Sequence, residues 1–174
     1  MDLNVELFYI INHNLQNPIF DFIMPIFTNF GSFLGLFLIC IACLIITRHY
    51  KNEKYFRIAK LCLFALLISG GITLCLKLAI VEERPFVTLS NVRQLVVPSE
   101  PNSFPSGHTS SIFSIATILI HEFWKNKALV IVLVIFSLMI PFSRVYCGVH
   151  YPGDVLVGMM VGILSGFIVL KLKI

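Results

Sequence analysis

Three short polar stretches interrupt an otherwise apolar chain, and their side chains are of the kinds that bind and transfer phosphate. They supply three cations, two imidazoles and a carboxylate. The residues are, in order, Lys77, Arg84 and Pro85; Pro105, Ser106, Gly107 and His108; and Ser143, Arg144, His150 and Asp154. Cations stabilise the oxygens of a transferring phosphoryl group, and a histidine can carry that group covalently. The inventory predicts phosphoryl transfer through a histidine.

The first two stretches also have simpler structural interpretations. On a continuous helix, Lys77 and Arg84 would share one face about 10 Å apart, and Pro85 would end the helix. By themselves, they could be a lysine that reaches the membrane interface and an arginine at a loop start. At Gly107 the backbone could approach a ligand closely, and N–H groups at a helix start suit an anion, although Ser106 could simply cap the helix.

The third stretch offers a nucleophile. His150 and Asp154 lie four residues apart at the start of the last apolar run, and we expect Pro152-Gly153 to turn between them. A carboxylate there can accept one ring N–H and leave the other ring nitrogen free to attack. The pair alone is equally compatible with a structural contact, so its meaning depends on the other two stretches.

Composition indicates a membrane protein. Of the 174 residues, 57% are hydrophobic and 13% charged, and the mean hydropathy is +0.91, outside the range of soluble domains. The net charge is +4, but the basic residues fall in short clusters between apolar runs, as in membrane proteins. This placement argues against nucleic acid as a partner and for membrane lipids.

The apolar runs predict an all-α, polytopic membrane helical bundle with about five transmembrane helices. The expected spans are residues 31–47, 58–80, 108–123, 128–146 and 154–171. A crossing takes roughly 20 helical residues, so some runs are slightly short. A sheet has little support, because no regular period-2 alternation occurs and lipid leaves no partner for unpaired backbone groups.

We expect two regions: residues 1–30, as short N-terminal helices at the interface or partly inserted, and residues 31–174, as a single transmembrane phosphatase bundle. Asp21 and Pro25 interrupt the second N-terminal apolar piece, which looks too short to span the membrane. The chain starts without the basic residues and cleavage site of a signal peptide, so we expect this segment to be retained.

The lysines and arginines predict the orientation. Nine of the thirteen fall at alternate ends of the predicted spans, which the positive-inside rule assigns to the cytoplasm. They are Arg48, Lys51, Lys54, Arg57, Lys60, Lys125, Lys127, Lys171 and Lys173. The remaining four, Lys77, Arg84, Arg93 and Arg144, fall at the external ends, and three of these belong to the polar stretches. The candidate site should therefore face the extracytoplasmic side of the cell membrane.

The cysteines and glycines are explained by packing. The five cysteines are odd in number and lie within or near the ends of the apolar runs, so we expect packing thiols rather than a metal site. Gly158, Gly162 and Gly166 recur every fourth residue, as do Gly31 and Gly35. Such spacing lets helices approach closely, and we favour packing within one chain over a dimer contact.

Taken together, the three stretches resemble the signature of the type 2 phosphatidic acid phosphatase superfamily, K-x6-R-P, P-S-G-H and S-R-x5-H-x3-D. Every position is filled in order between Lys77 and Asp154, nearly half of the chain. Chloride peroxidases that use vanadate share this constellation, but they are soluble and larger. The flanking apolar runs fit the superfamily's helical bundle.

The resemblance implies a role for each residue. His150 would be the nucleophile, oriented by Asp154, and His108 the general acid and later the base. Lys77, Arg84 and Arg144 would bind the phosphate oxygens, with Ser106 and the Gly107 N–H adding hydrogen bonds. Three fixed cations can stabilise the transferring group without magnesium, so we expect no cofactor and no metal.

The expected substrate is a lipid phosphate, because the site lies at a membrane face. Small bacterial members of the superfamily act on undecaprenyl diphosphate, phosphatidylglycerol phosphate, phosphatidate or lipid A 1-phosphate. Polyprenyl diphosphate, a carrier of cell wall biogenesis, fits best, and the loop from about residue 81 to 104 should help to select it. The alternative of another class is a non-catalytic binding or transport protein, which should show internal repeats and midplane polar residues. The sequence shows neither.

Overall fold

The computed structural model describes residues 2–172, and these form a helical protein in which no strand occurs. The elements are α1 (Leu3–Tyr9), the π-helix η1 (Ile10–Asn14), α2 (Pro18–Asn29), α3 (Phe33–His49), α4 (Glu53–Ala79), α5 (Pro85–Thr88), α6 (Gly107–Glu122), α7 (Lys127–Tyr146) and α8 (Pro152–Lys171). The prediction of an all-α bundle is confirmed.

Local capping explains where four of these helices begin. In each, an Asn or Ser side chain accepts the N–H of the residue three positions on. The pairs are Asn17 with Phe20, Ser32 with Gly35, Asn52 with Tyr55 and Asn126 with Leu129. Such caps satisfy backbone donors that a helix leaves unpaired in its first turn. They fix the starts of α2, α3, α4 and α7 at polar breaks between apolar runs.

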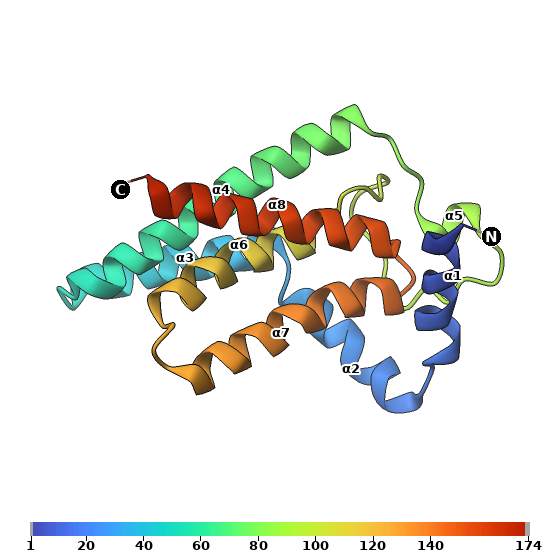
Figure 1. Ribbon diagram of the computed structural model, residues 1–174, viewed down its shortest axis with the longest axis horizontal. Helices are drawn as coiled ribbons and strands as arrows, with labels where there is room; N and C mark the ends of the chain where they lie inside the picture. The colour runs from blue at the N-terminus through green and yellow to red at the C-terminus, as the bar shows by residue number, and fades with distance from the viewer. Residues whose placement is uncertain (1, 173–174) are drawn as a thin grey trace.

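The centre of the bundle is α6, which packs against α8, α4 and α7 (Figure 1). Three glycines of α8 make this contact close. A Cβ at Gly158 would lie 2.6 Å from the Ser106 carbonyl oxygen, and one at Gly162 would lie 2.5 Å from that of Ser110. Gly166 meets Thr117 of α6 in the same way. The predicted role of this stripe in packing within one chain is confirmed.

Three helices, α4, α7 and α8, are long and apolar enough to cross a membrane, and α2 with α3 forms a bent pair that would make a fourth span. The bend between α2 and α3 is 55°. The predicted runs coincide with α3, α4, α6, α7 and α8, although α4 starts at Glu53 rather than near residue 58. Since α6 has only 16 residues, below the roughly 20 of a typical span, the count of five stays a prediction.

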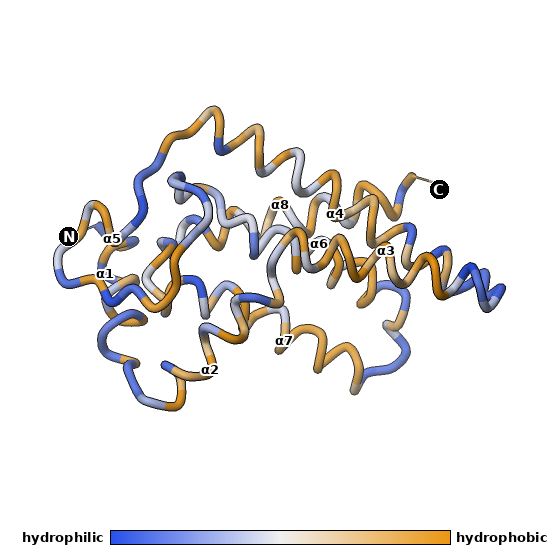
Figure 2. The backbone as a smooth tube through the Cα atoms, turned by 180° about the vertical axis from the view of Figure 1, so that it is seen from behind, coloured by the Kyte–Doolittle hydropathy of each residue, from blue (hydrophilic) through white to orange (hydrophobic). Residues whose placement is uncertain are grey.

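The two ends of the bundle differ in chemistry. Figure 1 shows the α3–α4 turn, the α6–α7 turn and the C-terminus at one end, and α1 and α5 at the other. The tube is apolar along the helices and polar at the turns (Figure 2). The basic residues of the two turns therefore lie at one end, as the sequence predicts. Of that predicted set, Lys173 lies outside the described residues.

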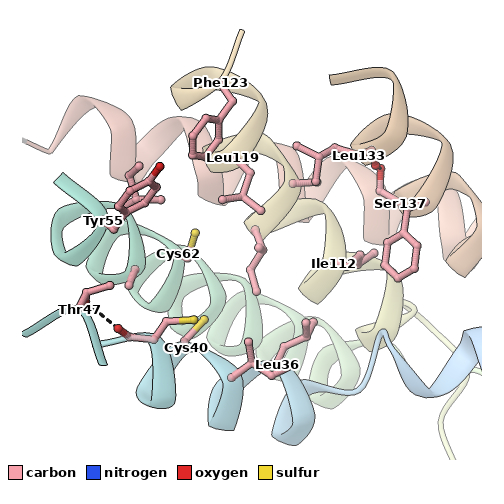
Figure 3. A pocket seen from close by; sticks show the side chains of 17 residues that line it. Leu36, Cys40, Thr47, Tyr55, Cys62, Ile112, Leu119, Phe123, Leu133 and Ser137 are labelled. Atoms are coloured by element: carbon pink, nitrogen blue, oxygen red, sulfur yellow. Dashed lines mark hydrogen bonds between the residues drawn. The ribbon is translucent and has the colours of Figure 1, made fainter. Parts of the chain in front are cut away.

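An apolar cavity of about 430 Å³ lies among α3, α4, α6 and α7 (Figure 3). Three cysteines line it: Cys40, Cys43 and Cys62. All five cysteines of the chain are free thiols, and Cys40, Cys62 and Cys147 are buried. In residues 2–172 no group of His, Cys, Asp or Glu is arranged to hold a metal ion.

Candidate active site

A second, polar cavity of about 420 Å³ lies at the end of the bundle opposite the basic turns, and it unites the three polar stretches. Six of the eight predicted site residues line it: Lys77, Arg84, Gly107, His108, Arg144 and His150. They come from α4, the loop after it, α6, α7 and the α7–α8 connection. The α2–α3 corner and residues 96–100 complete the wall. The cavity gathers three cations and two imidazoles.

His150 and Asp154 form the predicted pair. The His150 Nδ1 atom lies 3.2 Å from Asp154 Oδ2, and both side chains are almost fully buried. The Tyr151 N–H donates to the same carboxylate oxygen at 2.9 Å. We expected Pro152 and Gly153 to turn between the pair. They instead form the first turn of α8. Proline suits that position because its fixed φ matches a helix and its missing N–H costs nothing there.

The surroundings of His150 keep its ring neutral. Burial lowers its pKa well below the ordinary value, and the positive charges of Arg144, Arg84 and Lys77 lower it further. Its Nε2 atom faces Arg84, whose Nη1 lies 3.3 Å away. A neutral imidazole whose Nδ1–H faces a carboxylate carries its lone pair on Nε2, and Nε2 is then the ring atom that can attack phosphorus.

Lys77 and Arg84 meet across a loop rather than along a helix, so the expectation of one continuous helical face is wrong. α4 ends at Ala79, and Arg84 has an extended backbone just before α5. Pro85 favours the extended backbone of Arg84, because a proline disfavours the helical conformation at the residue before it. Pro85 also begins α5 instead of ending α4. The two cations still converge, since Lys77 Nζ and Arg84 Nη2 donate to the Asn102 carbonyl at 2.8 and 3.1 Å.

Backbone carbonyls hold the Arg84 guanidinium in place. Its Nε donates to the Glu100 carbonyl at 2.9 Å and its Nη1 to the Val149 carbonyl at 2.7 Å. The Glu100 carboxylate lies 3.4 Å from Lys77 Nζ, with 59% of its side chain exposed. The cations are thus positioned by neutral groups and by one exposed acid at the mouth of the cavity.

Arg144 has a hydrogen-bond donor that is not used. Its Nη1 donates to Thr28 Oγ1 at 2.6 Å, while its buried Nε has no partner. An unpaired buried guanidinium nitrogen is costly, and an anion in the cavity would satisfy it. Arg144 is therefore the cation best prepared for an incoming phosphate.

The start of α6 supplies the remaining predicted residues. Gly107 and His108 occupy its first turn and line the cavity, and Ser106 is the buried N-cap residue. The Ser106 side chain does not cap the helix but accepts a hydrogen bond from Thr109 Oγ1 at 3.0 Å. The cavity thus includes the start of a helix, where backbone N–H groups suit an anion.

Three residues of the site were not predicted from the sequence. Thr28 binds Arg144, Asn102 accepts from two cations, and the Ser103 hydroxyl donates to Asp154 Oδ2. Ser103 lies in the loop to which we assigned selectivity, five residues before His108, and that nearness was the only available signal. Nothing in the sequence connects Thr28 with Arg144, because 116 residues separate them.

Chemically, the cavity combines a carboxylate-oriented imidazole, a second imidazole and three cations. A phosphoryl group placed among them would find its equatorial oxygens surrounded by positive charge. Inline attack from His150 would then require a proton donor for the leaving oxygen, and His108 is the remaining candidate in the cavity.

The chain is similar to several known proteins. The family model for the PAP2 superfamily matches residues 59–173. The bacitracin transport permease protein BcrC of Bacillus licheniformis is 34% identical over 97% of this chain and 79% of its own length. Undecaprenyl-diphosphatase BcrC of Bacillus subtilis is 34% identical over 95% and 82%. Lipid A 4′-phosphatase of Bacteroides thetaiotaomicron is 26% identical over 96% and 75%.

A solved structure agrees with these relatives. The crystal structure of Aquifex aeolicus LpxE superimposes with a TM-score of 0.80 at 33% identity and covers 98% of this chain and 96% of that one. The match therefore includes the N-terminal helices that precede the family model. The motif residues, the fold and the relatives agree, and the chain belongs to the PAP2 superfamily.

Proposed function

We propose that this membrane lipid phosphatase removes the terminal phosphate of a polyprenyl diphosphate, of which undecaprenyl diphosphate is the expected form, through a phosphohistidine at His150. The observation that carries the proposal is the buried His150–Asp154 pair facing Arg84 in a cavity that Lys77 and Arg144 also line. The same residues serve any lipid phosphate, so the geometry supports the chemistry and the relatives support the substrate.

The reaction proceeds in two balanced steps. His150 Nε2 attacks the terminal phosphorus and forms an N–P bond, while the P–O bond to the polyprenyl monophosphate breaks and His108 protonates the departing oxygen. Water then attacks the phosphohistidine, His108 takes the proton, and the N–P bond breaks to release phosphate. Asp154 holds the ring in both steps, and Lys77, Arg84 and Arg144 neutralise the charge that develops on the equatorial oxygens.

The substrate choice rests on two relatives named for BcrC, one of which is called an undecaprenyl-diphosphatase. The name of the lipid A 4′-phosphatase keeps a lipid A phosphate as the main alternative within the same chemistry, beside phosphatidylglycerophosphate and phosphatidate. The other BcrC relative is named a transport permease, which leaves a non-catalytic lipid-phosphate binding or transport protein as an outcome of the test.

A substrate panel tests the function. Purified protein in detergent, with EDTA present, is offered undecaprenyl diphosphate, phosphatidylglycerophosphate, phosphatidate and lipid A phosphates, and released phosphate is measured. We expect the highest kcat/KM for undecaprenyl diphosphate and no loss on chelation, because protein cations replace a metal. A higher kcat/KM for another lipid phosphate would change the proposed substrate. Activity that EDTA removes and magnesium restores would contradict the proposal that the three cations of the protein replace a metal. If no phosphate is released from any lipid, the non-catalytic alternative is favoured.

We further propose five spans, α3, α4, α6, α7 and α8, with the catalytic cavity at the extracytoplasmic face and α1 to α2 at or partly within that interface. The segregation of basic residues to the opposite end supports this orientation. A short α6 can still cross, because the polar residues of the site and of the α6–α7 turn would finish its ends in the interface.

Single cysteines test the orientation. In a variant whose five native cysteines are replaced by alanine, Gln94→Cys lies in the loop beside the cavity, and Glu53→Cys lies at the start of α4; both positions are exposed. In intact cells a membrane-impermeant maleimide should label Gln94→Cys and leave Glu53→Cys unlabelled until the membrane is opened. The reverse pattern would place the site in the cytoplasm, although the phosphatase chemistry would stand.

A further inference from the structure

Ser103 makes contacts that the assigned motifs do not explain. It precedes the Pro-Ser-Gly-His stretch, lies outside the predicted site residues, and its side chain is fully buried. Its hydroxyl donates to Asp154 Oδ2 and lies 3.4 Å from His150 Nδ1. A buried hydroxyl between a carboxylate and an imidazole affects both groups, because in a medium of low polarity hydrogen bonds decide orientation and charge.

The contacts define a small network with one arrangement of protons. Asp154 Oδ2 faces three donors: the Tyr151 N–H at 2.9 Å, His150 Nδ1 at 3.2 Å and the Ser103 hydroxyl. An ionised carboxylate only accepts, so Ser103 must give it its proton. The Ser103 oxygen then has lone pairs left, and His150 Nδ1–H lies between two acceptors. Both acceptors favour the tautomer with the proton on Nδ1 and the lone pair on Nε2.

The loop itself is held at this point. The Ser103 N–H donates to the Glu82 carbonyl at 2.7 Å, and the side-chain amide of the preceding Asn102 donates to the Lys77 carbonyl at 3.1 Å. The Asn102 carbonyl in turn accepts from Lys77 and Arg84. The dipeptide therefore links two parts of the site. Asn102 contacts the cations Lys77 and Arg84, and Ser103 contacts the His150–Asp154 pair.

We infer that Ser103 is a positioning residue of the reaction, which fixes the Asp154 carboxylate and the attacking tautomer of His150 through its hydroxyl. The inference rests on the proposed function, in which His150 is the nucleophile. Ser103 does not reach the phosphate itself and is absent from the cavity lining, so its effect passes through Asp154 and His150. It should therefore influence the chemical step and leave substrate binding unchanged.

The test is a double-mutant cycle in kcat. Ser103→Ala should lower kcat about 10- to 100-fold, because it removes a hydrogen bond that orients the reacting His150–Asp154 pair. KM should stay within twofold of wild type. In the Asp154→Ala background, assayed at high enzyme concentration, Ser103→Ala should add less than about threefold, because Asp154→Ala already removes the acceptor of the Ser103 hydroxyl. The control is Ser90→Ala, an exposed serine of the same loop, which should behave like wild type.

Each result decides the inference. Equal fold losses in the wild-type and Asp154→Ala backgrounds, a rise in KM without a fall in kcat, or wild-type behaviour of Ser103→Ala would overturn it. If Ser103→Ala fails to yield folded protein by size exclusion and thermal melting, Ser103→Cys replaces it, since a thiol keeps the shape and donates only weakly. Absence of phosphatase activity in the wild-type protein would instead refute the proposed function, so the two failures are distinguishable.

Discussion

Replacing His150 with alanine should lower kcat by about 10⁴-fold or more, because the covalent route is lost and water would have to attack the phosphate unaided. The loss should be this large because nothing else in the cavity has a carboxylate-oriented lone pair facing an arginine. The measurement is phosphate release from undecaprenyl diphosphate by protein that elutes and melts like wild type.

A trapped intermediate gives the same prediction a second readout. Wild-type protein mixed with substrate labelled in its terminal phosphate and quenched during turnover should carry label that is stable to alkali and labile to acid, as a phosphohistidine is. His150→Ala should carry none. His121→Ala is the matched control, since His121 lies in the last turn of α6 at the opposite end of the bundle. Turnover by His150→Ala near the wild-type rate would remove His150 from its proposed role.

Arg144→Met should lower kcat/KM by about 10³-fold, the size of effect seen when an arginine that stabilises a transferring phosphoryl group is lost. Methionine roughly keeps the volume and removes the charge. Arg144 gives the clearest test of the three cations. Lys77 and Arg84 also donate to backbone carbonyls, so their loss would disturb the loop as well. Arg144 donates only to the Thr28 hydroxyl and has a buried nitrogen without a partner.

The control for Arg144 is Arg93→Met. Arg93 lies at the same end of the bundle but pairs with Asp21 and does not line the cavity. Its loss should change kcat/KM by a few-fold at most. Vanadate, which mimics the five-coordinate transition state, should inhibit the wild type strongly and Arg144→Met far more weakly. Equal vanadate affinity in wild type and Arg144→Met would show that Arg144 does not touch the transferring group.

The sequence was most informative where a short stretch carries its own geometry. His150 lies just before α8 and Asp154 lies in its first turn, and the four-residue spacing predicted that they would meet, as they do at 3.2 Å. Gly158, Gly162 and Gly166 recur every fourth residue and predicted close packing with another helix of the chain, which in the structure is α6. Neither feature needs information from elsewhere in the chain.

Local conformations that depend on competing preferences were predicted less well. Pro85 and Pro152 were each expected to end or turn the backbone, yet each begins a helix. A proline is compatible with both outcomes, and the neighbouring contacts decide between them. At Arg84 the deciding contacts are the carbonyls of Glu100, Asn102 and Val149, and two of these belong to the loop that closes over it.

By itself, then, the sequence determined the helical membrane class, the order of the long helices and the set of residues that we propose to react, because apolar run length and side-chain chemistry are local properties. Only the tertiary structure decided how those groups are held. Thr28 meets Arg144, and Ser103 meets Asp154, across 116 and 51 residues. Such contacts arise from packing α2 on α7 and folding the loop onto α8, and a buried polar group takes whichever partner that packing brings within reach.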